Sequence, residues 1–164
     1  MTQHLTSLPV LLPMLAGIIL LMPPCGKSQS IRRFVSVTLS FITFILSLFL
    51  LLKVQADGTQ VYAIGDWSAP FGIVLVADPL STLLTSLAAL LGAVSVLYAS
   101  AGDDAKGSFF HPLVHFMIFG VNGAFLTGDA FNLFVFFEVL LIASYALLMH
   151  GGDKKNTRAA LQYV

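Results

Sequence analysis

Long apolar runs separated by short polar segments set the pattern of this 164-residue chain. A membrane-spanning helix needs about 20 predominantly apolar residues, because it must cross roughly 30 Å of hydrocarbon. Five segments meet or approach that length: Leu5–Met22, Phe34–Leu52, Pro79–Ala99, Phe109–Leu126 and Ala130–Met149. The pattern predicts an all-α integral membrane protein, a polytopic bundle of about five transmembrane helices.

The apolar pattern of a further helix begins near the C-terminal end of the sequence and is incomplete there. Residues 159–164 follow Arg158 and look like the start of a sixth helix, so we expect a truncated chain or one piece of a longer protein. We divide the chain into residues 1–108, which hold the first three helices, and residues 109–164, which hold the last two and the start of a sixth.

The longest stretch without a helical pattern is Val54–Asp78, between the second and third predicted helices. Two β-prone runs, Val61–Ile64 and Phe71–Val76, lie within it, and turn-forming residues separate them. A small β-hairpin in this loop is predicted, on the outer surface. After it, Asp78 and Pro79 form a strong start for the third helix, as an N-cap and a first-turn proline.

Composition supports the membrane class. Apolar residues make up 57% of the chain and charged residues 10%, against about 25% charged in soluble domains. The formal net charge is zero, so nothing suggests a nucleic-acid partner. One cysteine, Cys25, excludes an internal disulfide and a cysteine-rich metal site.

Basic residues predict how the chain is oriented. Of the eight Lys and Arg residues, all but Lys53 fall in loops that alternate to one side of a five-helix bundle: Lys27, Arg32, Arg33, Lys106, Lys154, Lys155 and Arg158. The positive-inside rule places that side in the cytoplasm. The N-terminus and the predicted hairpin are then expected outside.

Glu138 is the main candidate for chemistry. It is the one formal charge within the five predicted spans, and it lies about 12 Å from the Ala130 end of its helix, near mid-membrane. Such a residue is expected to be buried inside the protein and either paired with a cation or protonated. Both states suit a proton carrier; the alternative is a structural hydrogen bond between helices.

Three further polar residues are weaker candidates. His115 lies within the fourth helix, where it is either a proton relay or a packing histidine. Asp129 and Asn132 lie at the start of the fifth helix, and Asp129 is expected to cap it. The alternative is that Asp129 and Asn132 form a site where cations enter.

Small residues recur at helical spacing in the second helix, at Ser36, Ser40, Thr43 and Ser47. Such a row lets helices approach closely, and the alternative is a hydrated pathway lined by hydroxyl groups. The sequence contains no nucleophile–base pair, metal-ligand spacing or phosphate-binding loop. We therefore expect no covalent catalysis, no cofactor and no bound metal.

Two segments resemble a known family. The run Gly123–Tyr145 (GAFLTGDAFNLFVFFEVLLIASY) is similar to the fourth-to-fifth helix region of the D-type subunits of Mrp-type multisubunit cation/proton antiporters. Gly65–Leu75 (GDWSAPFGIVL) resembles a segment typical of the same D-type subunits. The broader family includes the antiporter-like membrane subunits of NADH:quinone oxidoreductase.

The resemblance implies a fold of about fourteen helices built around two inverted five-helix repeats, the first of which begins within residues 109–164. It implies that Glu138 is the family glutamate that passes protons and pairs with a lysine two helices further on. The matching lysine falls beyond Val164. A chain ending there is not expected to transport alone.

The predicted function is therefore a part of a multisubunit Na⁺(K⁺)/H⁺ antiporter, a secondary transporter and not an enzyme, in the bacterial inner (cell) membrane. Its expected partners are other antiporter subunits, protons, Na⁺ or K⁺, and the lipid bilayer. Two alternatives stay open: a proton-pumping membrane subunit of NADH:quinone oxidoreductase, and a truncated fragment without transport activity.

Overall fold

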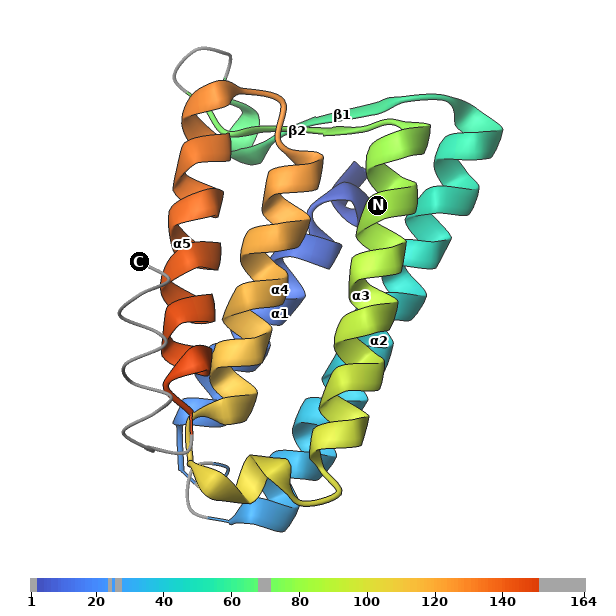
Figure 1. Cartoon of the computed structure of the whole chain (residues 1–164). Helices are drawn as coiled ribbons and strands as arrows, with labels where there is room; N and C mark the ends of the chain where they lie inside the picture. Colours follow the sequence, from blue (N-terminus) through green and yellow to red (C-terminus); the bar gives the residue numbers. More distant parts are fainter. Residues whose placement is uncertain (1–2, 24, 26–27, 68–71, 151–164) are drawn as a thin grey trace.

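The computed structural model describes residues 3–23, 25, 28–67 and 72–150, which fold mainly into helices that run side by side (Figure 1). The α-helices of this part of the chain are α1 (Leu8–Leu21), α2 (Gln29–Asp57), α3 (Pro79–Ala99), α4 (Phe110–Leu126) and α5 (Ala130–Leu148). By length and composition, α2, α3 and α5 can cross a membrane, whereas α1 and α4 are apolar but shorter. The predicted helical membrane class is confirmed. The predicted sixth helix lies outside the described residues.

Helix α2 is longer than the apolar run Phe34–Leu52 predicted. Its 29 residues continue through Arg32 and Arg33 at one end and past Lys53 at the other, because neither flank contains glycine or proline. It ends at Gly58, whose φ of 82° lies in the left-handed region that favours glycine. The charged residues therefore lie at the ends of the helix, and its centre is uncharged as expected.

Strands β1 (Gln60–Ala63) and β2 (Val74–Ala77) pair antiparallel, with Tyr62 opposite Leu75, and confirm the predicted hairpin. Leu75 and Ala77 alternate inward and are fully buried at one end of the bundle (Figure 1). The Gly128 N–H donates to the Val74 carbonyl at 2.8 Å, so the hairpin also holds the α4–α5 turn.

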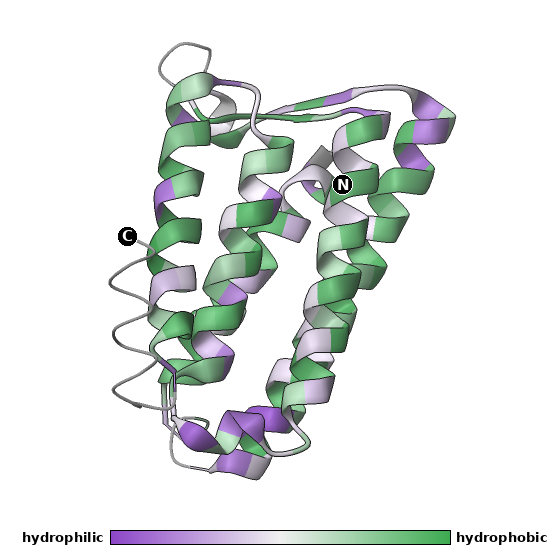
Figure 2. Ribbon diagram, in the orientation of Figure 1, coloured by the Kyte–Doolittle hydropathy of each residue, from purple (hydrophilic) through white to green (hydrophobic). Residues whose placement is uncertain are grey.

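The distribution of side chains on α2 is inverted relative to a soluble helix. Its buried face carries Ser36, Ser40, Thr43 and Ser47, each at most 2% exposed, while Phe34 and Phe49 are 74% and 59% exposed. Figure 2 shows that hydrophilic residues gather mainly at the two ends of the bundle. Small buried residues and large outward apolar residues suit a helix surrounded by lipid.

A proline explains one contact between α1 and α4. Pro13 lies inside α1 and has no N–H, so the carbonyl of Pro9, four residues earlier, loses its helical partner. Asn122 of α4 is fully buried and donates its Nδ2–H to that carbonyl at 2.8 Å. Because the bilayer core offers no water to replace such a bond, Asn122 satisfies the carbonyl that Pro13 leaves free.

Helix α5 lies at the edge of the bundle and packs mainly against α4 (Figure 1). A Cβ atom at Gly120 would lie 2.8 Å from the Leu140 backbone nitrogen, and one at Gly123 would lie 2.2 Å from the Phe136 ring. Glycine at these two positions of α4 therefore permits the close approach. Phe136 and Ala143 are the residues of α5 that become buried in it.

Candidate functional site

Glu138 lies on the exposed face of α5. The buried residues Phe136 and Ala143 lie on one side of the helix, and at 3.6 residues per turn position 138 falls nearly opposite to them. Glu138 makes no hydrogen bond or ion pair with any residue that the structure describes. Among the described residues α5 has its neighbours on one side and Glu138 faces the other, so the predicted burial of Glu138 is not seen here and stays a prediction.

The surroundings of Glu138 on that face are apolar. Phe134 and Ile142, one turn to either side, are 62% and 65% exposed. A carboxylate in the middle of a membrane helix costs about 3 kcal/mol on insertion scales when it faces lipid. The position therefore favours a partner that covers this face.

Asp129 caps α5, as the sequence predicts. Its Oδ1 accepts the backbone N–H of Asn132 at 2.7 Å, and its Oδ2 accepts the side-chain amide of the same residue. The backbone hydrogen bond from Asn132 lowers the pKa of the Asp129 carboxyl, and the side-chain bond adds to it. The cap accounts for both residues, and a role in cation entry stays a prediction.

His115 lies in a buried hydrogen-bonded chain of side chains that joins three elements. In α4, His111 and His115 are fully buried, and both contact Ser36 of α2, since His111 Nδ1 and His115 Nε2 each lie 3.0 Å from Ser36 Oγ. The far nitrogen of His111, Nε2, lies 3.0 Å from Asp104 Oδ2. Asp104 belongs to η3 (Asp103–Lys106), a short 3-10 helix between α3 and α4.

Arg33 closes the outer end of this chain. Its Nε and one terminal nitrogen each donate to a different oxygen of Asp104 at 2.6 Å, in a two-pronged ion pair. The Arg33 side chain is 34% exposed, whereas the Asp104 side chain has no exposed surface. This series of hydrogen-bonded side chains thus begins beside solvent and leads inward along α4. We call Asp104, His111, Ser36 and His115 the buried polar chain.

Local geometry explains how these residues meet. His111 and His115 are four positions apart, so they lie on the same face of α4. Ser36 is small enough to bring α2 close to both imidazole rings. Asp104 returns to the bundle because η3 folds the α3–α4 loop under the end of the helices (Figure 1).

Electrostatics keep the acid of the buried polar chain ionised. The hydrogen bonds from Arg33 hold the pKa of the Asp104 carboxyl well below its usual range, against the opposing effect of burial. The hydrogen bond with His111 contributes in the same direction. Asp104 is therefore ionised at neutral pH and accepts the hydrogen bonds of Arg33 and His111.

Sequence reasoning found only part of this site. His115 is a candidate from the sequence and Ser36 belongs to a predicted packing row, but neither His111 nor Asp104 is singled out there. The spacing of the two histidines was the available signal. The structure does not bring His115 and Glu138 together, because His115 faces α2 and Glu138 faces away from α4.

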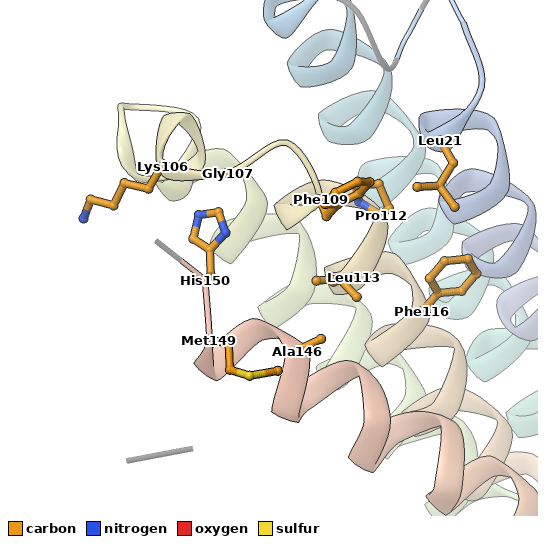
Figure 3. Close-up of a pocket in the computed structure, with 10 residues that line it drawn as sticks. All are labelled: Leu21, Lys106, Gly107, Phe109, Pro112, Leu113, Phe116, Ala146, Met149 and His150. Carbon is orange, nitrogen blue, oxygen red and sulfur yellow. The ribbon is translucent and has the colours of Figure 1, made fainter. Parts of the chain in front are cut away.

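An apolar cavity of about 500 Å³ lies between the end of α5, α4 and the loop before α4 (Figure 3). Leu21, Phe109 and Phe116 line it, and His150 points toward the loop, with its Nε2 3.2 Å from the Asp103 carbonyl oxygen. No carboxylate is among the lining residues. In the described part of the chain, no cluster of three or more His, Cys, Asp or Glu residues could hold a metal ion.

The long apolar helices and their large exposed apolar side chains define the class of this molecule: a polytopic helical membrane protein. No family model matches the chain. It is 42% identical over 164 residues to the D-type subunit of the Na⁺/H⁺ antiporter of Alkalihalophilus pseudofirmus and equally to that of Bacillus subtilis. It is 41% identical over 168 residues to the D-type subunit of a probable K⁺/H⁺ antiporter of Rhizobium meliloti.

These matches cover 99% of this chain but 31–33% of the relatives, so the chain spans about a third of their length. Among solved structures, the Mrp complex from Dietzia sp. DQ12-45-1b matches 98% of this chain and 30% of that chain with a TM-score of 0.88 and 30% identity. The chain is thus related over its whole length to the D-type subunits of Mrp-type antiporters, and the resemblance carried by its motifs is confirmed.

A second solved structure shows the fold alone. The membrane-bound sulfane sulfur reductase, an archaeal respiratory membrane complex, matches 96% of this chain and 33% of that chain. The TM-score is 0.81 and the identity is 23%. The helical arrangement is therefore shared between an antiporter complex and a respiratory complex.

Proposed function

We propose that this chain forms part of the D-type subunit of a multisubunit Na⁺(K⁺)/H⁺ antiporter in a bacterial cell membrane. The observation that carries the proposal is the identity of 42% along the whole chain to proteins named as D-type subunits of Na⁺/H⁺ antiporters. Its partners are the other subunits of such a complex and the rest of a polypeptide about three times its length. Residues 109–164 form the start of the antiporter-like repeat.

In this proposal Glu138 carries protons. Its place near the centre of an apolar 19-residue helix supports the role, because ionisable residues at that depth are costly and typically mark proton or ion pathways. The exposed face of α5 is the surface that further helices of a full-length subunit cover. Coverage removes the cost of facing lipid and supplies polar groups that favour either the carboxylate or the acid.

The orientation follows from the basic residues. Arg33 and Lys106 lie at one end of the bundle, near η3, and the hairpin lies at the other (Figure 1). We place the end with Arg33 and Lys106 in the cytoplasm, which puts the N-terminus outside.

A proton-pumping subunit of a respiratory complex is the second candidate, favoured by the likeness of fold to the archaeal respiratory structure. The antiporter is preferred because the identity to antiporter subunits is 41–42%, against 23% for the respiratory structure.

The test uses the complete antiporter complex in sealed vesicles with a pH-sensitive dye. A sodium or potassium gradient should drive proton movement in the wild type, Glu138→Ala should abolish it, and Glu138→Asp should retain a part. Phe134→Leu, one turn away on the same exposed face, serves as the matched control and should keep the wild-type rate.

Full activity of Glu138→Ala in an assembled complex refutes the role of Glu138. In the Glu138→Cys variant, labelling of position 138 by a lipid-soluble reagent from the bilayer refutes the proposal that further helices cover this face of α5. Absence of cation-driven proton movement in the wild-type complex refutes the antiporter assignment itself.

A further inference from the structure

The buried polar chain has a defined hydrogen-bond direction. Ionised Asp104 can only accept, so the His111 Nε2–H donates to it, and the other nitrogen of a neutral His111, Nδ1, accepts. Ser36 then donates its hydroxyl proton to His111 Nδ1 and accepts the Nε2–H of His115. Every hydrogen bond in the series therefore points toward Asp104: His115 donates to Ser36, Ser36 donates to His111, and His111 donates to Asp104.

The inner end of this chain is an open acceptor. His115 is fully buried, and its Nδ1 has no hydrogen-bond partner among the described residues. Leaving a buried polar atom unsatisfied costs about 1–3 kcal/mol, so a merely structural histidine would be expected to use both nitrogens. By the direction derived above, Nδ1 carries a free lone pair, and the atom itself is buried.

We propose that Asp104, His111, Ser36 and His115 form a proton relay between the interior of the bundle and the end that carries Arg33. The relay rests on the proposed antiporter function, since transport supplies the proton, but it uses residues of this chain other than Glu138. It assigns a role to a region, the α2–η3–α4 contact, that is separate from α5.

The transfer balances at every step. A proton binds His115 at Nδ1, and the Nε2 proton of His115 passes to Ser36 Oγ. Ser36 gives its own hydroxyl proton to His111 Nδ1, and His111 becomes an imidazolium beside the Asp104 carboxylate. His111 then passes its Nε2 proton to Asp104 Oδ2, and loss of that proton to solvent beside Arg33 restores the Asp104 carboxylate. Every group then has its original charge, and the hydrogen-bond direction through both imidazoles and the Ser36 hydroxyl is reversed.

Arg33 has a positioning role in this relay. Its two bonds hold both Asp104 oxygens in place and keep the carboxylate ready to stabilise an imidazolium. Because Arg33 is partly exposed, the outer end of the relay lies next to water.

Ser36 is the group whose removal tests proton transfer without breaking the structural hydrogen bonds of Asp104. Ser36→Ala deletes one oxygen atom between the two imidazoles and leaves the Arg33–Asp104–His111 bonds in place. Ser40 provides a matched control: it lies one turn further along the same face of α2, is 1% exposed, and its Oγ has no partner among the described residues. Ser40→Ala therefore makes the same chemical change without touching the relay.

The experiment measures cation-driven proton movement by the complete complex in vesicles, per assembled complex. Ser36→Ala should lower the rate about a hundredfold or more, the effect of losing one positioned proton-transfer group. Ser40→Ala should keep at least half of the wild-type rate. A Ser36→Ala rate equal to that of Ser40→Ala overturns the relay while leaving the antiporter assignment intact, whereas an inactive wild type overturns the antiporter assignment and the relay with it.

A second measurement does not depend on transport. Nitrogen-15 NMR of the histidine side chains in the wild-type complex should show both His111 and His115 protonated at Nε2. In Ser36→Ala the His115 signal should shift while the His111 Nε2 signal stays hydrogen-bonded to Asp104. A His111 protonated at Nδ1 in the neutral form overturns the direction of the chain and the relay built on it.

Discussion

Helix α4 meets its neighbours in two different ways. Toward α2 and η3 it presents His111 and His115, whose nitrogens hydrogen-bond to Ser36 and Asp104. Toward α5 it presents Gly120 and Gly123, which offer no side chain at all. One interface is specified by directed hydrogen bonds and the other by shape.

The two interfaces illustrate the two ways in which helices recognise each other in a membrane. Without water to drive apolar surfaces together, helices associate through close packing and through hydrogen bonds. Glycine serves the first and buried polar groups the second. The glycine interface holds α5 in place, while the polar interface carries groups that can exchange protons.

Gly120→Ala should cause the largest loss of stability, because the new Cβ atom would lie 2.8–3.0 Å from backbone atoms of Leu140 and Phe136. Backbone cannot move aside as a side chain can, so we expect a loss of about 3 kcal/mol, the upper end for overpacking. Thermal denaturation in detergent, followed by circular dichroism, measures it.

Gly92→Ala is the control for that prediction. Its Cβ atom would meet the tip of the Ile118 side chain, which can change rotamer. We expect a loss of about 1 kcal/mol, the lower end for overpacking. Equal losses for the two variants would show that close backbone approach does not specify the α4–α5 contact.

Asp104→Ala should have the next largest effect. It removes the acceptor of His111 and leaves Arg33 without this partner. Breaking a buried ion pair costs about 3–5 kcal/mol, but partial exposure of Arg33 screens the loss, so we expect about 2 kcal/mol. The same denaturation experiment measures it, and a loss below about 0.5 kcal/mol, the size of a surface substitution, would contradict it.

The Asp104 carboxyl also predicts how the stability of the folded protein depends on pH. Its pKa in the folded state lies below the ordinary value of 3.8, so its contribution is fully present above about pH 4 and is lost as the pH falls further. Wild-type stability should decline below about pH 4 more steeply than that of Asp104→Ala. Parallel stability curves for the two proteins would exclude Asp104 as the source.

Asn122→Ala should have a smaller effect than Gly120→Ala and Asp104→Ala, about 1 kcal/mol, by removing the hydrogen bond to the Pro9 carbonyl. Pro13→Ala restores the N–H that the Pro9 carbonyl lacks within α1, so Asn122→Ala should cost less in that background. A double-mutant cycle measures the coupling, and additive losses would show that Asn122 does not compensate for Pro13.

Much of the fold could be predicted because local signals were strong. Helix α3 begins and ends where predicted, at Pro79 and Ala99, since Asp78 accepts the Leu80 and Ser81 N–H groups. The hairpin formed in the predicted loop. The ends of α2 were missed because hydropathy marks the apolar centre of a helix and not the charged turns that extend it.

By itself the sequence determined that the chain is a helical membrane protein and where its apolar helices lie, because length and hydropathy are local properties. Its motifs also determined which family it resembles. Only the tertiary structure decided that Glu138 faces outward and that Arg33 and Asp104, 71 positions apart, join His111 and Ser36 in one buried chain. Helical periodicity shows which residues share a face. The neighbour that the face meets depends on how the whole bundle packs.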